Sequence, residues 1–139
     1  MRALGVDLGS KRIGIAVSDS GGAVATPIAT LQRTRQLAGD HAAIAELVAE
    51  WGAGVVVVGV PYSLDGSVGP AARAVLDEIG ALTAALTVPV ETIDERFTTV
   101  TAGQRLQEQG VRGARRTALV DQAAASVLLQ SWLDGRRRT

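Results

Sequence analysis

The most constraining feature of this sequence is the run Val55-Val-Val-Val58, four consecutive β-branched residues with no polar residue among them. Such a run is typical of a central parallel strand, because its side chains alternate between the two faces of a sheet and both faces must be covered. Helical spacing of apolar residues flanks the run, over residues 36–51 and 71–86. We therefore expect an α/β sheet with helices on both faces.

The rest of the chain completes this pattern. Residues 3–9 and 12–18 alternate large and small side chains around a short turn, which predicts an antiparallel hairpin. Residues 23–31 predict a third strand that Pro27 restricts to an edge or a bulge. Residues 88–93 predict a fifth strand, and 98–109 and 117–133 predict two further helices, separated by a basic loop and ended by Gly135. The order predicts a mixed five-stranded sheet, an antiparallel meander followed by parallel strands, in one domain over residues 1–139.

Composition excludes several kinds of site. The chain has no cysteine, which excludes thiolate sites. Its one histidine, His41, lies in a helix that we expect to expose it to solvent. This disfavours a catalytic triad and histidine-ligated zinc. Fourteen Lys and Arg balance fourteen Asp and Glu, so any contact with an anionic partner depends on how the charges are arranged. No apolar run approaches the roughly 18 residues of a membrane span, and no signal peptide is recognisable. We expect a cytoplasmic protein with no membrane partner.

Carboxylates occupy three unusual positions. Asp7 lies within the first strand, where an acid costs desolvation free energy unless it is paired or bound to a metal, and small residues on its face leave room for another element. Asp121 shares an apolar helix face with Ala124, Ala125 and Leu128. Asp94 and Glu95 follow the fifth strand, and strand alternation allows only one of them to face a site shared with Asp7.

Each of these acids also has an ordinary structural interpretation. Asp7 would accept backbone hydrogen bonds at a strand end, and Asp121 would stabilise the first turn of its helix through the helix dipole. Asp94 or Glu95 would pair with Arg96 on the surface. If the acids converge instead, they form a set of oxygen ligands suited to Mg²⁺ or Mn²⁺, ions that polarise a phosphoryl group and activate water.

Four motifs occur in an order that resembles the YqgF family, also called RuvX. They are Gly5-Val-Asp-Leu-Gly-Ser-Lys-Arg-Ile-Gly-Ile-Ala-Val-Ser-Asp19, Val58-Gly-Val-Pro61 with Asp65-Gly-Ser67, Asp94-Glu-Arg-Phe-Thr-Thr99, and Val120-Asp-Gln-Ala-Ala-Ala125. The family consists of small bacterial proteins assigned to pre-16S rRNA cleavage and similar to Holliday junction resolvases. The resemblance covers nearly the whole chain and implies a ribonuclease H-like fold with a divalent-metal nuclease site.

The resemblance also assigns the site residues. It carries the catalytic and metal-binding roles onto Asp7, Glu95 and Asp121, and thereby selects Glu95 over Asp94. Resolvases of the related RuvC type have another acid three residues after the helix aspartate, where this chain has Ala124. That departure weighs against tight binding of two metals and against junction resolution as the main activity.

Cations flank each proposed acid in the sequence. The expected contacts to nucleic acid phosphates come from these residues: Lys11, Arg12, Arg96, Arg115 and Arg116. Each is equally interpretable as an ordinary solvated cation. Aromatic residues make up only 3% of the chain, so recognition is expected to use backbone and shape more than base stacking.

The function expected from these features is metal-dependent hydrolysis of phosphodiester bonds in pre-16S rRNA by a monomer or homodimer. One alternative is a Holliday junction resolvase acting on branched DNA. Another is a noncatalytic nucleic-acid-binding factor in ribosome assembly or transcription, which the presence of three acids disfavours. The first hairpin also resembles the phosphate loop of sugar kinases and actins, but those proteins close two such domains around a nucleotide, and this chain has length for one.

Overall fold

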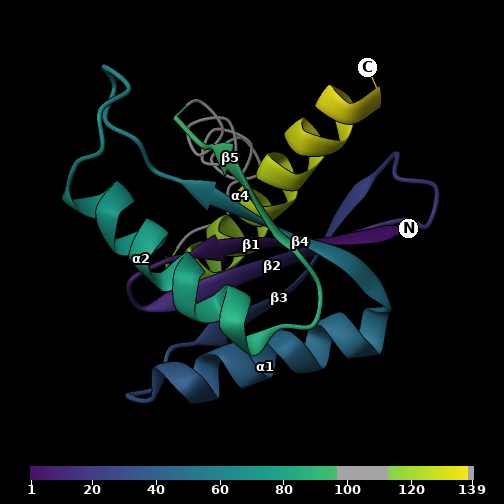
Figure 1. The fold of residues 1–139 in the computed structure, drawn as a ribbon, viewed down its shortest axis with the longest axis horizontal. Helices are drawn as coiled ribbons and strands as arrows, with labels where there is room; N and C mark the ends of the chain where they lie inside the picture. The colour runs from purple at the N-terminus through teal and green to yellow at the C-terminus, as the bar shows by residue number, and fades with distance from the viewer. Residues whose placement is uncertain (97–112, 138–139) are drawn as a thin grey trace.

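The computed structural model describes residues 1–96 and 113–137, with the side chains of 113–120 and 137 outside the description (Figure 1). The strands are β1 (Arg2–Leu8), β2 (Arg12–Ser18), β3 (Ala25–Gln32), β4 (Ala53–Val60) and β5 (Val90–Asp94). They form one sheet in the order β3-β2-β1-β4-β5, in which β1, β2 and β3 pair antiparallel and β4 lies parallel to both β1 and β5. The predicted mixed sheet is confirmed.

Helices cover both faces of this sheet. Helices α1 (Leu37–Trp51) and α2 (Pro70–Ala85) lie on one face, and α4 (Gly113–Arg137) lies on the other (Figure 1). Large side chains fill the core between this face and the helices α1 and α2, including Leu4 and Val6 of β1 and Ile44 of α1. The valine run lies in β4 and is almost completely buried, as its composition predicts.

Small residues allow α4 to approach its face of the sheet closely. A Cβ atom on Gly5 would lie 2.8 Å from the Cβ of Leu129, and one on Gly14 would collide with the Asp121 carbonyl oxygen. The space predicted above Asp7 is therefore filled by the helix that carries Asp121. Both faces of β1 are buried.

Helix α4 differs most from its predicted bounds. It begins at Gly113, inside the segment expected to be a loop, and continues through Gly135, which was expected to end it. One glycine costs a helix only about 1 kcal/mol, and contacts in the last turn offset that cost. The Arg136 guanidinium lies 4.6 Å from the centroid of the Trp132 ring, and it pairs with Glu91 of β5 at 3.9 Å.

His41 is buried, contrary to the expectation that it would be exposed. Only 2% of its surface is accessible, because α1 turns this residue toward α2, where its Nε2 lies 2.8 Å from Oε2 of Glu78. A polar partner on a second helix cannot be recognised from helical spacing within the first.

The smaller differences are at element ends. Strand β3 begins at Ala25, because the side chain of Asp19 accepts hydrogen bonds from the amides of Ala23 and Val24 and holds them in the preceding turn. The expected edge position and bulge at Pro27 are both found. The helix expected over 98–109 falls outside the described residues. Within the part of the chain that is described, no helix is long and apolar enough to cross a membrane.

Candidate active site

Asp7 lies near the end of β1, opposite Gly14 of β2, on the face that packs against α4. Burial raises the pKa of its carboxyl group to about 6, and the negative charge of Asp121 adds to the rise. Within the described part of the chain, no hydrogen-bond donor reaches this carboxylate. The interpretation of Asp7 as an acceptor of backbone hydrogen bonds therefore finds no support in its surroundings.

Asp121 reaches the same region from α4. Because the helix begins at Gly113, Asp121 lies in its third turn, and the first turn contains no acidic residue, so the helix dipole does not explain its position. The Arg12 Nε donates a hydrogen bond of 2.7 Å to the Oδ2 of Asp121, and both side chains are largely buried. Arg12 thus holds this carboxylate against β2.

The structure separates the two acids at the end of β5, of which Asp94 is the last residue of the strand and Glu95 follows it. Asp94 pairs with Arg96, whose Nε donates to its Oδ2 at 2.8 Å, and this contact lowers the pKa of Asp94. Burial raises the pKa of Glu95 to about 7, and the charges of Asp7 and then Asp94 add to the rise. Asp94 therefore forms the surface ion pair with Arg96, whereas Glu95 faces Asp7.

Gly59 of β4 makes room for Glu95. A Cβ atom on Gly59 would lie 2.5 Å from the Oε2 of Glu95 and 3.0 Å from the Cδ2 of Leu128. The amide of Glu95 also donates a hydrogen bond to the Val60 carbonyl at 3.2 Å, which holds the chain close to β4. A glycine directly after the buried valine run was the available signal that something approaches this strand.

Asp7 is a neighbour of both other acids. The charge of Asp7 raises the pKa of Glu95, and the charge of Asp121 raises the pKa of Asp7. Among the described residues, no group of three acidic or histidine side chains is already arranged to hold a metal ion. The donors nevertheless suit Mg²⁺ or Mn²⁺, which bind one or two carboxylates and complete their shell with water and substrate oxygens. A cation at these carboxylates would offset the burial and the charge repulsion that raise their pKa values.

The predicted phosphate-binding cations are differently engaged. Lys11 is exposed in the β1–β2 turn, whereas Arg12 is bound to Asp121. Arg96 binds Asp94, and its terminal nitrogen donates to the Leu64 carbonyl at 3.3 Å, which ties the β4–α2 loop to the end of β5. The side chains of Arg115 and Arg116 lie outside the described residues.

Comparison with known proteins identifies the family. A family model described as RuvX, Holliday junction resolvase, matches residues 1–135. A protein of Mycobacterium sp. (strain KMS) is 45% identical over 137 residues, covering 98% of this chain and 81% of the relative. One from Myxococcus xanthus (strain DK1622) is 46% identical over 137 residues, covering 99% and 90%. Both are provisionally named pre-16S rRNA nuclease.

Solved structures identify the fold. RuvC of Thermus thermophilus, in a complex with a Holliday junction substrate, superposes with a TM-score of 0.58 at 16% identity and covers 99% of this chain and 96% of its own. RuvC determined alone gives a TM-score of 0.57 at 16% identity, covering 100% and 98%. The expected ribonuclease H-like fold is confirmed, and the chain belongs to the RuvX family, which is described as Holliday junction resolvases.

Proposed function

We propose that this protein is a divalent-metal-dependent nuclease that hydrolyses phosphodiester bonds of pre-16S rRNA with Asp7, Glu95 and Asp121. The observation that carries the proposal is the position of Asp7, a desolvated carboxylate with an acid on either side of it and no hydrogen-bond donor within reach in the described structure. A buried acid with a purely structural role is normally paired or hydrogen-bonded, because a buried carboxylate with no such partner destabilises the folded protein. The names of the relatives support the substrate.

The three acids share one part in the proposed reaction, and neighbouring cations position them. Asp7, Glu95 and Asp121 would hold Mg²⁺ or Mn²⁺, which when bound would polarise the scissile phosphate and activate water. Arg12 keeps Asp121 oriented toward the other acids through its hydrogen bond of 2.7 Å. Arg96 holds Asp94 away from Glu95, so that only one acid of the adjacent pair enters the site. Lys11, exposed in the turn that follows Asp7, is placed to contact a substrate phosphate.

Branched DNA is the second candidate substrate, favoured by the family description and by the likeness to RuvC in fold. The position where RuvC-type resolvases have a further acid is Ala124 here, and it is 4% exposed against the sheet. One fewer carboxylate favours the binding of a single metal. A resolvase would also need two copies of the site on a two-fold junction, and the corresponding oligomer here would be a homodimer. Cleavage of precursor rRNA needs only one copy of the site, which a monomer supplies. This function would also place the protein in the cytoplasm.

The test compares cutting of a labelled precursor 16S rRNA fragment and of a four-way DNA junction in Mg²⁺, Mn²⁺ or EDTA. The variants are Asp7→Asn, Glu95→Gln and Asp121→Asn, with Asp94→Asn as the matched control beside Glu95. We expect RNA cuts that need the metal, that fall at least about 100-fold in the three site variants and that survive in the control.

Other outcomes would redirect the assignment. Paired symmetric cuts in the junction, with intact RNA, would make the protein a dimeric resolvase. Binding of both substrates without cutting either would refute the catalytic assignment and leave a nucleic-acid-binding factor. Equal losses in Asp94→Asn and Glu95→Gln would contradict the separation of these two acids.

A further inference from the structure

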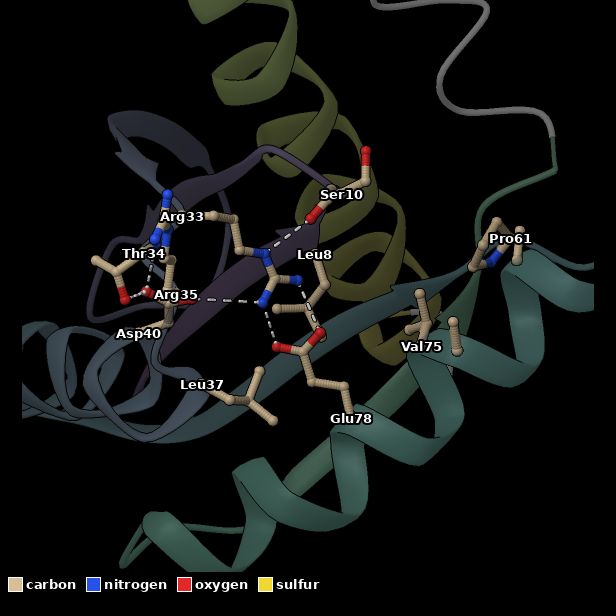
Figure 2. Close-up of a pocket in the computed structure, with 13 residues that line it drawn as sticks. Leu8, Ser10, Arg33, Thr34, Arg35, Leu37, Asp40, Pro61, Val75 and Glu78 are labelled. Atoms are coloured by element: carbon tan, nitrogen blue, oxygen red, sulfur yellow. Dashed lines mark hydrogen bonds and ion pairs between the residues drawn. The ribbon is translucent and has the colours of Figure 1, made fainter.

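A cavity of about 480 Å³ opens on the face of the sheet opposite the proposed active site (Figure 2). It lies between α1 and α2, at the ends of β1 and β4. Six of the thirteen residues that line it are apolar: Leu8, Leu37, Pro61, Ala71, Ala74 and Val75. Cavities of this size that combine apolar walls with a few polar groups commonly bind small molecules or single groups of larger ligands.

The floor of the cavity is a preorganised polar network. Both terminal nitrogens of Arg33 donate to the Glu78 carboxylate at 2.7 Å (Figure 2). The same carboxylate also contacts the Nε2 of His41 at 2.8 Å. Asp40 is buried and accepts hydrogen bonds from the amide and hydroxyl of Thr34 at 2.9 and 2.8 Å. Such carboxylates keep acceptor sites that could bind amino groups of a ligand.

The cavity and the proposed active site share one turn. Gly9 and Ser10, which line the cavity, follow Asp7 and Leu8 in the β1–β2 turn. Asp7 and Leu8 point to opposite faces, and consecutive strand residues are only about 3.3 Å apart. Arg33 fixes this turn from the cavity side, because its Nε donates to the Gly9 carbonyl at 2.9 Å and its amide donates to the Lys11 carbonyl at 3.0 Å.

Positive charge lies where a nucleic acid strand would leave the cavity. Arg35 is exposed at the cavity, and Lys11 is exposed on the shared turn. A strand with its scissile phosphate at Asp7 would pass over this turn, which carries Ser10, to reach the cavity. Apolar walls suit the faces of a nucleobase, Asp40 suits its amino groups, and Arg35 suits its phosphate.

We propose that the cavity receives one unpaired nucleotide of the substrate strand, next to the bond that the active site hydrolyses. The inference rests on the proposed nuclease function, and it narrows the substrate to a strand that is single-stranded beside the cut. A base inside a duplex could not enter, because it remains stacked and paired.

Fluorescence of 2-aminopurine tests this proposal without cleavage. The base is placed at one position at a time along the single-stranded segment of a precursor 16S rRNA fragment, and binding is measured in EDTA, since phosphate contacts do not need the metal. Ala74→Phe fills the cavity from an exposed position on α2. Ala84→Phe makes the same change at an exposed position on α2 that does not line the cavity.

We expect a fluorescence change at one nucleotide for the wild type and Ala84→Phe, and its loss in Ala74→Phe together with about tenfold weaker binding. Arg35→Ala should weaken binding and reduce its salt dependence, whereas Arg73→Ala, at an exposed arginine on α2 that does not line the cavity, should do so less. When a complementary strand pairs the segment, Ala74→Phe and the wild type should bind equally.

The proposal is overturned if no position responds, if the fragment does not bind, or if Ala74→Phe and Ala84→Phe bind alike. Failure of the nuclease function would look different. The wild type would then cut nothing in Mg²⁺ or Mn²⁺, while the fluorescence at one nucleotide would still report whether the cavity is occupied.

Discussion

Replacing Asp7 with asparagine should stabilise the folded protein at neutral pH, although we expect it to abolish cleavage. Burial and the charge of Asp121 raise the pKa of Asp7 from 3.8 to about 6. A carboxyl group whose pKa is higher in the folded protein holds its proton more tightly there than in the unfolded chain. Ionising it therefore costs folding free energy, up to about 3 kcal/mol once the group is fully ionised. Asparagine has nearly the same shape and no charge, so it avoids this cost.

The pH dependence of the difference follows from these two pKa values. Below about pH 4 the aspartate is protonated in both states, so the wild type and Asp7→Asn should unfold with similar free energies. The gap should grow mainly as the pH rises from 4 to 6, and a smaller increase should continue to about pH 7, where Glu95 ionises next to Asp7 in the wild type. In Asp7→Asn the pKa of Glu95 should also fall, because Asp7 is one of the charges that raise it.

Urea unfolding of the two proteins in EDTA, from pH 4 to pH 8, measures the difference directly. Asp77→Asn, at an exposed position on α2, is the control and should change the free energy of unfolding by less than about 0.5 kcal/mol at every pH. Adding Mg²⁺ should stabilise the wild type and narrow the gap, since the cation binds the folded site. A gap that does not vary with pH, or an Asp7→Asn protein less stable at pH 8, would refute the reasoning.

Three further predictions concern packing, the cavity floor and catalysis. Gly14→Ala should destabilise the protein by about 1–3 kcal/mol and reduce cleavage, because the new methyl group displaces the backbone of Asp121. Gly80→Ala, in an open position on α2, should instead stabilise it by about 0.5–1 kcal/mol. Urea unfolding measures both changes. Glu78→Gln should destabilise by about 2 kcal/mol through loss of a charged hydrogen-bond acceptor, and Glu46→Gln, exposed on α1, should have little effect in the same assay. The cleavage rate at low Mg²⁺ should rise up to about pH 7, because two site carboxylates with pKa values of about 6 and about 7 must ionise. Higher Mg²⁺ should move this rise to lower pH, since the cation binds the ionised carboxylates. A rate of the chemical step that does not vary with pH would contradict the assignment.

The sequence predicts this fold well because each strand carries a local signal. The valine run requires two covered faces, and the alternation over residues 3–9 and 12–18 requires a hairpin. Small residues opposite Asp7 indicate close approach of another element, and α4 fills that space. What the sequence could not supply were the C-terminal end of α4 and the burial of His41, because side chains from other elements contact both: Glu91 at the last turn of the helix and Glu78 at the histidine.

The acids illustrate the same limit. Strand alternation shows that Asp94 and Glu95 diverge, but it cannot say which of them faces Asp7. Arg96 decides this physically, because its contacts with Asp94 and with the Leu64 carbonyl turn that acid toward the β4–α2 loop. The space over Gly59 then accommodates the other acid. Arg33 was missed for a comparable reason, since its partners lie on a turn and on a helix far from it in the sequence.

The position of Arg33 joins the two faces of the sheet mechanically. Its side chain and its amide bind carbonyls on either side of the β1–β2 turn, and that turn begins beside Asp7 and leads into Arg12, which holds Asp121. Any shift of the turn would therefore move one proposed metal ligand and the residue that orients another. Because Glu78 fixes the Arg33 guanidinium with two hydrogen bonds, the cavity floor restrains the active site even when no strand is bound. A nucleotide entering the cavity would contact a surface already positioned relative to the scissile bond. Its binding would therefore align the substrate strand without rearranging the protein.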